Sequence, residues 1–209
     1  MNKNTVWMGL LGSIALFGGS MIAENVSADS KPVKLNAKQT SQVNRAFYNW
    51  AGQRAQKGNM AVSDWYFDHG AAGSGDWYAK TTQGELQIQD YGKPGRQAFK
   101  QHALGGVVFY TDKSGRVGKQ NLHKNNTLAQ NYSMRMNFKK PVTKYVLADT
   151  GTVYELKLDD KKPVSVTTGF GEYTDNGKKN NYIKTNEKFV VSKDKAAQKK
   201  LKQLIKEYR

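Results

Sequence analysis

Residues 77–90, WYAKTTQGELQIQD, decide the fold class of this chain. The segment 77–81 is rich in aromatic and β-branched residues, and Gln83-Gly84 supplies a tight turn. In the following segment, Leu86 and Ile88 alternate with polar residues. A connection this short joins antiparallel strands, because a parallel pair needs a long crossover. The stretch therefore predicts two neighbouring strands of an antiparallel sheet.

Further strands are expected on both sides of this stretch, where β-branched and aromatic residues gather between turns that contain glycine. The complete set of predicted strands is 61–67, 77–81, 85–90, 107–111, 132–138, 144–148, 152–158, 164–168 and 188–191.

Amphipathic helices are predicted before and after the strands. Asn36 and Gln39 have the spacing of a capping box, apolar residues then repeat at helical intervals, and Gly58 is a natural stop, so 37–57 is predicted to be helical. A second helix is expected at about 194–208, where an apolar stripe lies opposite a lysine-rich face. We expect the stripe to dock on the sheet, with a membrane-surface helix as the alternative. The predicted fold class is α+β, an antiparallel β-sheet with an N-terminal and a C-terminal amphipathic helix.

The first 28 residues are expected to be a signal peptide. A positive start precedes the apolar run 6–23, and Val26-Ser27-Ala28 offers the small residues that a signal peptidase accepts. A retained membrane helix is the alternative, but the run is short and diluted by glycine and serine. The expected organisation is a signal peptide over 1–28, a flexible leader over 29–36 and a single α+β domain over 37–209. The expected location is extracellular.

Charge and cysteine content narrow the expected partners. The chain of 209 residues has 33 Lys and Arg against 17 Asp and Glu, a net charge of +16, and no cysteine. The absence of cysteine excludes a disulfide scaffold and the cysteine of a lipid anchor. A cationic excess attracts polyanions, which outside the cell are wall phosphate polymers, acidic glycans and anionic membrane surfaces, so no specific nucleic acid is expected. The alternative is that the charge only keeps the protein soluble.

The segment 63–80, SDWYFDHGAAGSGDWYAK, is the densest cluster of residue types used in recognition. It is interpreted as a binding loop between two strands, in which aromatic faces stack on a sugar and carboxylates accept hydrogen bonds. The alternative is a hairpin whose aromatic residues fill the core. The predicted binding residues are Asp64, Trp65, Asp68, His69, Asp76, Trp77 and Tyr78.

Catalysis by the same segment is the weaker alternative. Asp68 could orient His69 beside Ser74, but the serine lacks a Gly-x-Ser-x-Gly elbow, and adjacent residues on a strand point to opposite faces. Paired carboxylates for glycoside hydrolysis could come from Asp64, Asp68, Asp76 or Glu85. No catalytic residue is therefore assigned. No metal or cofactor is expected, because the histidines are isolated and no phosphate-binding loop is present.

A second segment, 92–110, reads GKPGRQAFKQHALGGVVFY. It predicts a tight turn, a short helical piece and then a buried strand. The paired glycines Gly105-Gly106 at the strand entrance predict close backbone packing or a bulge. His102 is interpreted as a structural histidine, with a position in the same cleft as His69 as the alternative.

These two segments resemble a domain family of unknown function found in secreted and lipid-anchored proteins of lactic-acid bacteria. The resemblance is carried by SDWYFDHGAAGSGDWYAK and HALGGVVFY, and it is looser over the remaining strands. It implies an extracellular domain of a Gram-positive cell envelope and carries no assigned catalytic residues. Many relatives have a lipobox cysteine, which this chain lacks.

The sequence thus predicts a secreted, non-catalytic domain that binds an anionic or glycan component of the Gram-positive cell envelope. A small extracellular hydrolase that uses the Asp68/His69 loop is one alternative. A protein–protein interaction module is another.

Overall fold

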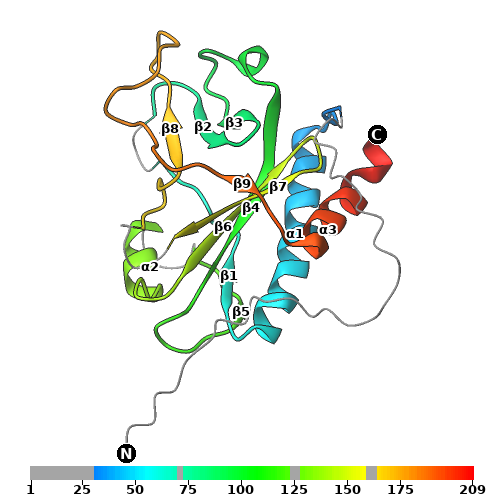
Figure 1. Ribbon diagram of the computed structural model, residues 1–209, viewed down its shortest axis with the longest axis vertical. Coiled ribbons are helices and arrows are strands. Elements are labelled where there is room, and N and C mark those ends of the chain that lie inside the picture. The colour runs from blue at the N-terminus through cyan, green and yellow to red at the C-terminus, as the bar shows by residue number, and fades with distance from the viewer. Residues whose placement is uncertain (1–30, 70–72, 123–127, 159–163) are drawn as a thin grey trace, which may run out of the picture.

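The computed structural model describes residues 31–69, 73–122, 128–158 and 164–209, so the predicted signal peptide lies outside the described residues. These residues form an α+β fold with three α-helices and a large, mostly antiparallel sheet (Figure 1). The helices are α1 (Ala37–Lys57), α2 (Leu128–Arg135) and α3 (Lys195–Ile205), with short 3-10 turns at Arg96–Ala98 and Lys206–Tyr208. The strands are β1 (Ala61–Ser63), β2 (Trp77–Thr81), β3 (Gly84–Gln89), β4 (Gln101–Tyr110), β5 (Gly118–Lys119), β6 (Val142–Ala148), β7 (Val153–Leu158), β8 (Phe170–Glu172) and β9 (Val190–Val191).

Strand β4 connects the two parts of the sheet. The strand order is β8-β2-β3-β4-β6-β7-β9, and β1 pairs with both β4 and β5. The first residues of β4 pair with β3, its last residues pair with β1, and its other edge pairs with β6 along most of its length. Most pairs are antiparallel as predicted, but β3–β4 and β1–β5 are parallel. The parallel β3–β4 pair is possible because the connection through residues 90–100 turns back before β4 begins.

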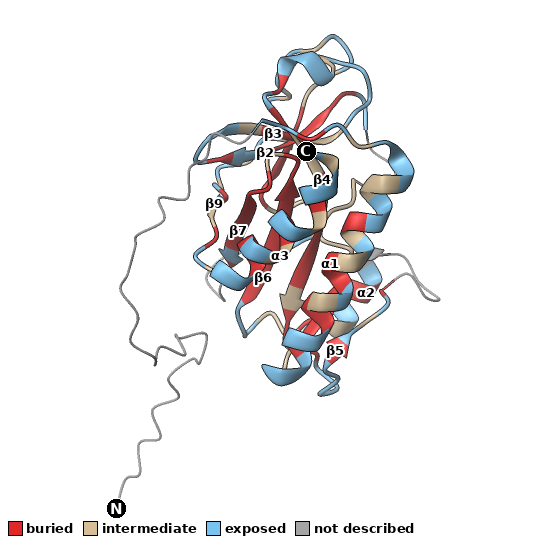
Figure 2. Cartoon of the chain, turned by 90° about the vertical axis from the view of Figure 1, so that its right-hand side faces the viewer, coloured by how far each residue is buried: buried red, intermediate tan, exposed pale blue. Residues whose placement is uncertain are grey.

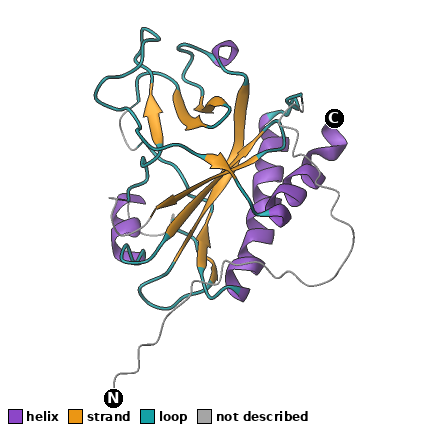
Figure 3. Cartoon of the chain, in the orientation of Figure 1, coloured by secondary structure: helices purple, strands orange, loops and turns teal. Residues whose placement is uncertain are grey.

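Both faces of the central strands are buried. Helices α1 and α3 cover one face, as Figure 2 shows, and α2 lies on the opposite side of the sheet (Figure 3). On the helical face, Phe47 and Leu201 pack with Leu147, whereas Tyr110 and Tyr154 fill the core on the other face. Every residue of β6 is buried, including the polar residues Thr143 and Lys144, as expected for a strand covered on both faces.

Helix α1 matches the predicted range because its end signals are local. The Asn36 side chain accepts a hydrogen bond from the Gln39 N–H, and the Gln39 side chain accepts one from the Asn36 N–H, both at 2.9 Å. Gly58 caps the other end and donates its N–H to the Arg54 carbonyl. The predicted capping box and stop are therefore confirmed.

Helix α3 docks on the sheet through its apolar stripe, as expected for the segment 194–208. Ala197, Leu201 and Ile205 are buried, while most of the lysines between them are exposed. Its N-cap is Asp194, whose carboxylate accepts a hydrogen bond from the Ala197 N–H. The same carboxylate forms an ion pair with Arg54 of α1, at 3.0 Å. The ion pair ties the two helices together at one end.

Two predicted strands are wrong. The segment 132–138, predicted as a strand, begins inside α2, and Met136, just after the helix, forms only an isolated β-bridge with Asp112. The segment 164–168, also predicted as a strand, is a turn, and the strand β8 follows it instead. The short helical piece expected after residue 95 is present as a 3-10 turn over Arg96–Ala98, but the strand after it begins at Gln101 and not at residue 107.

The predicted flexible leader 29–36 also needs correction where it is described. Val33 is buried in the core beneath α1 and α3, and its N–H donates to the Asp149 carbonyl at 3.0 Å. The end of this segment is therefore packed against the domain.

The predicted close approach at Gly105-Gly106 is confirmed. The register of β4 with β6 shifts between Ala103 and Gly105, which marks a bulge, and Gly105 has a φ of +138°. A Cβ atom on Gly105 would lie 2.2 Å from the Asn44 side chain of α1, and one on Gly106 would lie 2.3 Å from the Tyr145 carbonyl oxygen. Only glycines let the helix and both strands meet here.

We expect Gly105→Ala to destabilise the protein far more than Gly84→Ala. Both residues have a positive φ, but a Cβ on Gly84 meets nothing within 4 Å. The strain of the positive φ alone should cost about 1 kcal/mol in each variant. In Gly105→Ala the Asn44 side chain must also move, which should bring the total to about 3 kcal/mol or more. Chemical denaturation of both variants measures the difference, and equal losses would contradict the close contact.

Candidate functional site

The predicted binding segment 63–80 divides into a partly exposed half and a buried half. After β1 it runs through a loop whose residues 70–72 lie outside the described ones, and it ends in β2. Asp64, Trp65, Asp68 and His69 are partly exposed, whereas Asp76, Trp77 and Tyr78 are buried. The structure therefore does not bring all seven residues to one surface.

Asp76 is a structural carboxylate. It is 0% exposed and accepts hydrogen bonds from the backbone N–H groups of Tyr91, Gly92 and Gly95 at 2.7 to 2.9 Å. The Gln87 side-chain amide donates a fourth at 3.0 Å. A carboxylate with this many protein donors fixes the loop 91–95 in place and offers no free oxygen to a ligand.

Trp77 and Tyr78 fill the core. Trp77 is 1% exposed, with the Phe67 ring 5.2 Å away and the His69 ring stacked against it at 6.2 Å. The Tyr78 ring packs edge-on against Tyr173 at 5.2 Å. Neither residue presents a free ring face on which a sugar could stack, so these two aromatic residues are core, as in the alternative interpretation. The hairpin of that interpretation is wrong, because β1 pairs with β4 and β5 whereas β2 pairs with β3 and β8.

The groups named for hydrolysis are engaged elsewhere. The Nε2 atom of His69 lies 2.5 Å from the Tyr91 hydroxyl. The Glu85 carboxylate accepts a hydrogen bond from the Tyr173 hydroxyl at 2.7 Å and forms an ion pair with Lys179 at 2.6 Å. With Asp76 also occupied, this set offers little support for paired catalytic carboxylates.

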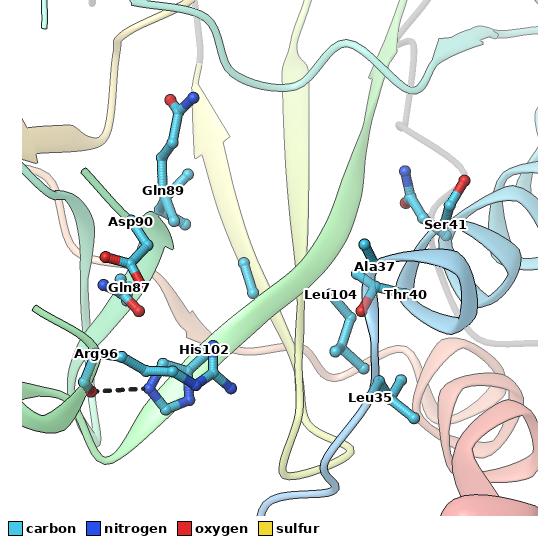
Figure 4. Close-up of a pocket in the computed structure, with 13 residues that line it drawn as sticks. Leu35, Ala37, Thr40, Ser41, Gln87, Gln89, Asp90, Arg96, His102 and Leu104 are labelled. Carbon is cyan, nitrogen blue, oxygen red and sulfur yellow. Dashed lines mark hydrogen bonds between the residues drawn. The ribbon is translucent and has the colours of Figure 1, made fainter. Parts of the chain in front are cut away.

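A pocket of about 550 Å³ lies between α1 and β3. Arg96, His102 and Leu104 in its lining belong to the segment 92–110, for which the sequence predicted a turn, a helical piece and a strand but no binding site. Figure 4 shows its two walls. One wall is the start of α1, with Leu35, Thr40 and Ser41, and the other is the end of β3 with the loop to Arg96. The first residues of β4 lie between the two walls. The lining comes from two distant parts of the chain, residues 35–44 and 87–104, so no local motif could have revealed the pocket.

His102 lies at the edge of this pocket and is held from both sides of its ring. Its Nδ1 atom is 2.7 Å from the carboxylate of Asp149, which is buried, and its Nε2 atom is 3.1 Å from the Arg96 carbonyl oxygen. The His102 backbone N–H also donates to Asp149 at 3.0 Å. Both ring nitrogens face acceptors, so neither is free to act as a base. This agrees with the interpretation of His102 as a structural histidine, and it lies in a different place from His69.

A second candidate surface is the outer face of α3. Lys195, Lys199, Lys202 and Lys206 are all exposed and follow one another at intervals of four, three and four residues. This spacing places them on one side of the helix, about 5–6 Å apart between Cβ atoms. None of the four makes an ion pair with a carboxylate among the described residues. We call these four residues the lysine ridge.

Comparisons of the chain with protein-family models, with curated proteins and with solved structures found no match. In the described part of the chain, no helix has the length and hydropathy of a membrane span. The same residues include no cluster of three or more His, Cys, Asp or Glu side chains placed to hold a metal ion. The pocket and the lysine ridge are therefore the two features of the described residues that bear on function.

Among the lysines and arginines of the described residues, Lys144 has the pKa that is shifted most. Its ammonium group is buried in β6 and donates hydrogen bonds to the carbonyls of Ser165, Val166 and Thr168 at 2.9 to 3.0 Å. Burial lowers the pKa of Lys144 from 10.5 to about 7. The three carbonyls belong to the turn that replaces the predicted strand 164–168, so Lys144 explains why that segment is folded back.

We expect Asp76→Asn to destabilise the protein by about 2–3 kcal/mol. Either oxygen that becomes an amide would face two N–H donors, and the buried backbone groups would lose their acceptor. Asp90→Asn is the matched control, because Asp90 is exposed and accepts a single hydrogen bond, from the Gly92 N–H at 3.0 Å. Chemical denaturation measures both variants. Equal, small losses would show that the Asp76 carboxylate does not organise the loop.

Lys144 should make stability depend on pH. The unfolded chain keeps the lysine proton up to about pH 10.5, whereas the folded protein releases it above about pH 7. The unfolded state therefore binds more protons between these values, and the free energy of unfolding should rise with pH relative to Lys144→Met, by at most about 1.4 kcal/mol per pH unit. Denaturation of both proteins at pH 7, 8 and 9 tests this. A difference that does not change with pH would mean that the buried amine stays protonated.

Proposed function

We propose that the protein is a non-catalytic binding domain that holds a linear polyanion of the Gram-positive cell envelope on its lysine ridge. A wall phosphate polymer is the partner class that we favour. The observation that carries the proposal is the lysine ridge, four exposed lysines in a row without carboxylate partners among the described residues.

The geometry of α3 supports a linear partner. The ridge covers twelve residues, from Lys195 at the start of α3 to Lys206 in the 3-10 turn directly after it, and is about 17 Å long. The opposite face of α3 is buried against the sheet through Leu201 and Ile205, so the helix cannot turn its lysines inward. The Arg54–Asp194 ion pair further fixes its orientation. A row of cations held in one direction matches a chain of regularly spaced phosphates, whereas a compact anion would contact only one or two of them.

The same geometry favours a polymer over a lipid surface. A helix that lies in a membrane interface needs an apolar face to insert among the lipids. In α3 the apolar residues Ala197, Leu201 and Ile205 are already buried in the core. Electrostatic attraction to the surface of a polyanion requires no insertion and uses the net charge of +16.

A variant with Lys195, Lys199, Lys202 and Lys206 all changed to Gln should lose binding to purified cell walls. The control changes four other exposed lysines to Gln, namely Lys57, Lys139, Lys178 and Lys184, and removes the same charge. At about 150 mM salt we expect the ridge variant to bind at least about five-fold more weakly than the control, with a shallower dependence on salt.

Sedimentation of each protein with walls measures the bound fraction, before and after the phosphate polymers are removed. Equal binding by the two variants would show that only total charge matters. Binding that ignores both salt and polymer would refute the proposed partner.

A further inference from the structure

The polar groups of the pocket between α1 and β3 are largely unused by the protein. The hydroxyls of Thr40 and Ser41 and the side-chain amide of Gln89 have no hydrogen-bond partner among the described residues. Asn44 uses its oxygen to accept the Gly106 N–H at 3.0 Å, which leaves its amide N–H groups available. Gln87 donates to Asp76 and leaves its carbonyl oxygen available. Hydroxyl and amide groups of this kind recognise ligand hydroxyls, because they both donate and accept.

Arg96 adds one cation to these neutral groups. Its side chain is 53% exposed, and its nearest carboxylate oxygen, on Asp149, is 3.9 Å away, which is longer than a hydrogen bond. No described residue accepts a hydrogen bond from its guanidinium group. The fork of N–H donors on Arg96 is therefore open to a carboxylate or a phosphate.

The backbone at Arg96 is already fixed by hydrogen bonds in the protein without a ligand. Its carbonyl accepts the hydrogen bond from His102, whose ring is fixed in turn by the buried Asp149. The preceding loop, 91–95, is fixed by the three backbone hydrogen bonds to Asp76. A cation on a fixed backbone loses less conformational freedom on binding than one on a free loop.

The remaining lining limits the ligand further. Leu35, Ile88 and Leu104 provide an apolar surface for carbon-bound hydrogens. The exposed carboxylate of Asp90 in the lining, and the buried carboxylate of Asp149 that contacts the His102 ring, would repel a ligand with many negative charges. The volume of about 550 Å³ is typical of small-molecule pockets.

We propose that this pocket binds an acidic saccharide, a small hydroxylated ligand with one oxyanion, with Arg96 holding the oxyanion and Thr40, Ser41, Asn44 and Gln89 holding the hydroxyls. The oxyanion is a carboxylate or a phosphate. The site is separate from the lysine ridge and uses none of its residues.

Nuclear magnetic resonance titration of the 15N-labelled protein tests this site. The ligands are D-glucuronate, D-glucose 6-phosphate, D-glucose and inorganic phosphate. At least one acidic sugar should shift the backbone amides of Ser41, Gln89 and Leu104 and bind at least ten-fold more tightly than glucose and than inorganic phosphate. Comparison of the two acidic sugars shows whether a carboxylate or a phosphate is preferred.

Arg96→Gln should remove the preference for acidic sugars, since only its side chain changes and its carbonyl still anchors His102. Lys100→Gln is the matched control, because Lys100 is exposed, is four residues away and does not line the pocket. It should leave the affinity within two-fold of the unchanged protein. Ser41→Ala should weaken both acidic sugars and leave the weak binding of inorganic phosphate unchanged.

Three results would overturn the proposal. The first is no amide shift in the pocket with up to 50 mM of either acidic sugar. The second is equal binding of acidic sugars by the Arg96→Gln and unchanged proteins. The third is binding of inorganic phosphate as tight as that of the acidic sugars, which would make the pocket an anion site without sugar recognition. Loss of wall binding in the ridge variant affects none of these measurements, so the two proposals fail separately.

Discussion

The meeting of α1, β4 and β6 at Gly105 and Gly106 is the constraint on which the rest of the structure depends. Because neither glycine has a side chain, Asn44 of α1 and the Tyr145 carbonyl of β6 can approach the β4 backbone from two sides. The bulge at this point lets one strand pair with β3 at its start and with β1 at its end. The neighbouring pocket is lined in part by Asn44 and Leu104, which lie beside this meeting point.

A second constraint is the buried Asp76 carboxylate, which takes part in the folding of the 63–80 segment and leaves the open polar groups at other positions. Asp76 accepts hydrogen bonds from the backbone of loop 91–95, so this carboxylate and the aromatic residues packed around it hold that loop in position. The groups left open to solvent lie on the segment that this support holds, at Arg96, and on the facing helix. In this fold the conspicuous aromatic segment stabilises the site, and less conspicuous polar residues form its surface.

Local signals explain which elements could be predicted from the sequence. Both ends of helix α1 were predictable to the residue, because the capping box of Asn36 and Gln39 and the stop at Gly58 are formed by residues at the helix ends themselves. The strand predicted at 132–138 is wrong because its β-favouring residues Tyr132 and Phe138 do not belong to one strand: Tyr132 lies in α2, and Met136 after the helix forms only an isolated β-bridge. The turn at 164–168 depends on the Lys144 ammonium, which is about twenty residues away in sequence. The pocket could not be predicted at all, since its walls meet only through the sheet topology.

The packing of α3 against α1 has a consequence for the order of folding. The two helices that close one face of the core, residues 37–57 and 195–205, lie far apart in the sequence. Strand β9, which pairs with β7, directly precedes the second of these helices. The apolar face of the sheet therefore stays exposed to solvent until residue 205 has been synthesised and α3 has docked. The many contacts between distant segments also make for slow folding.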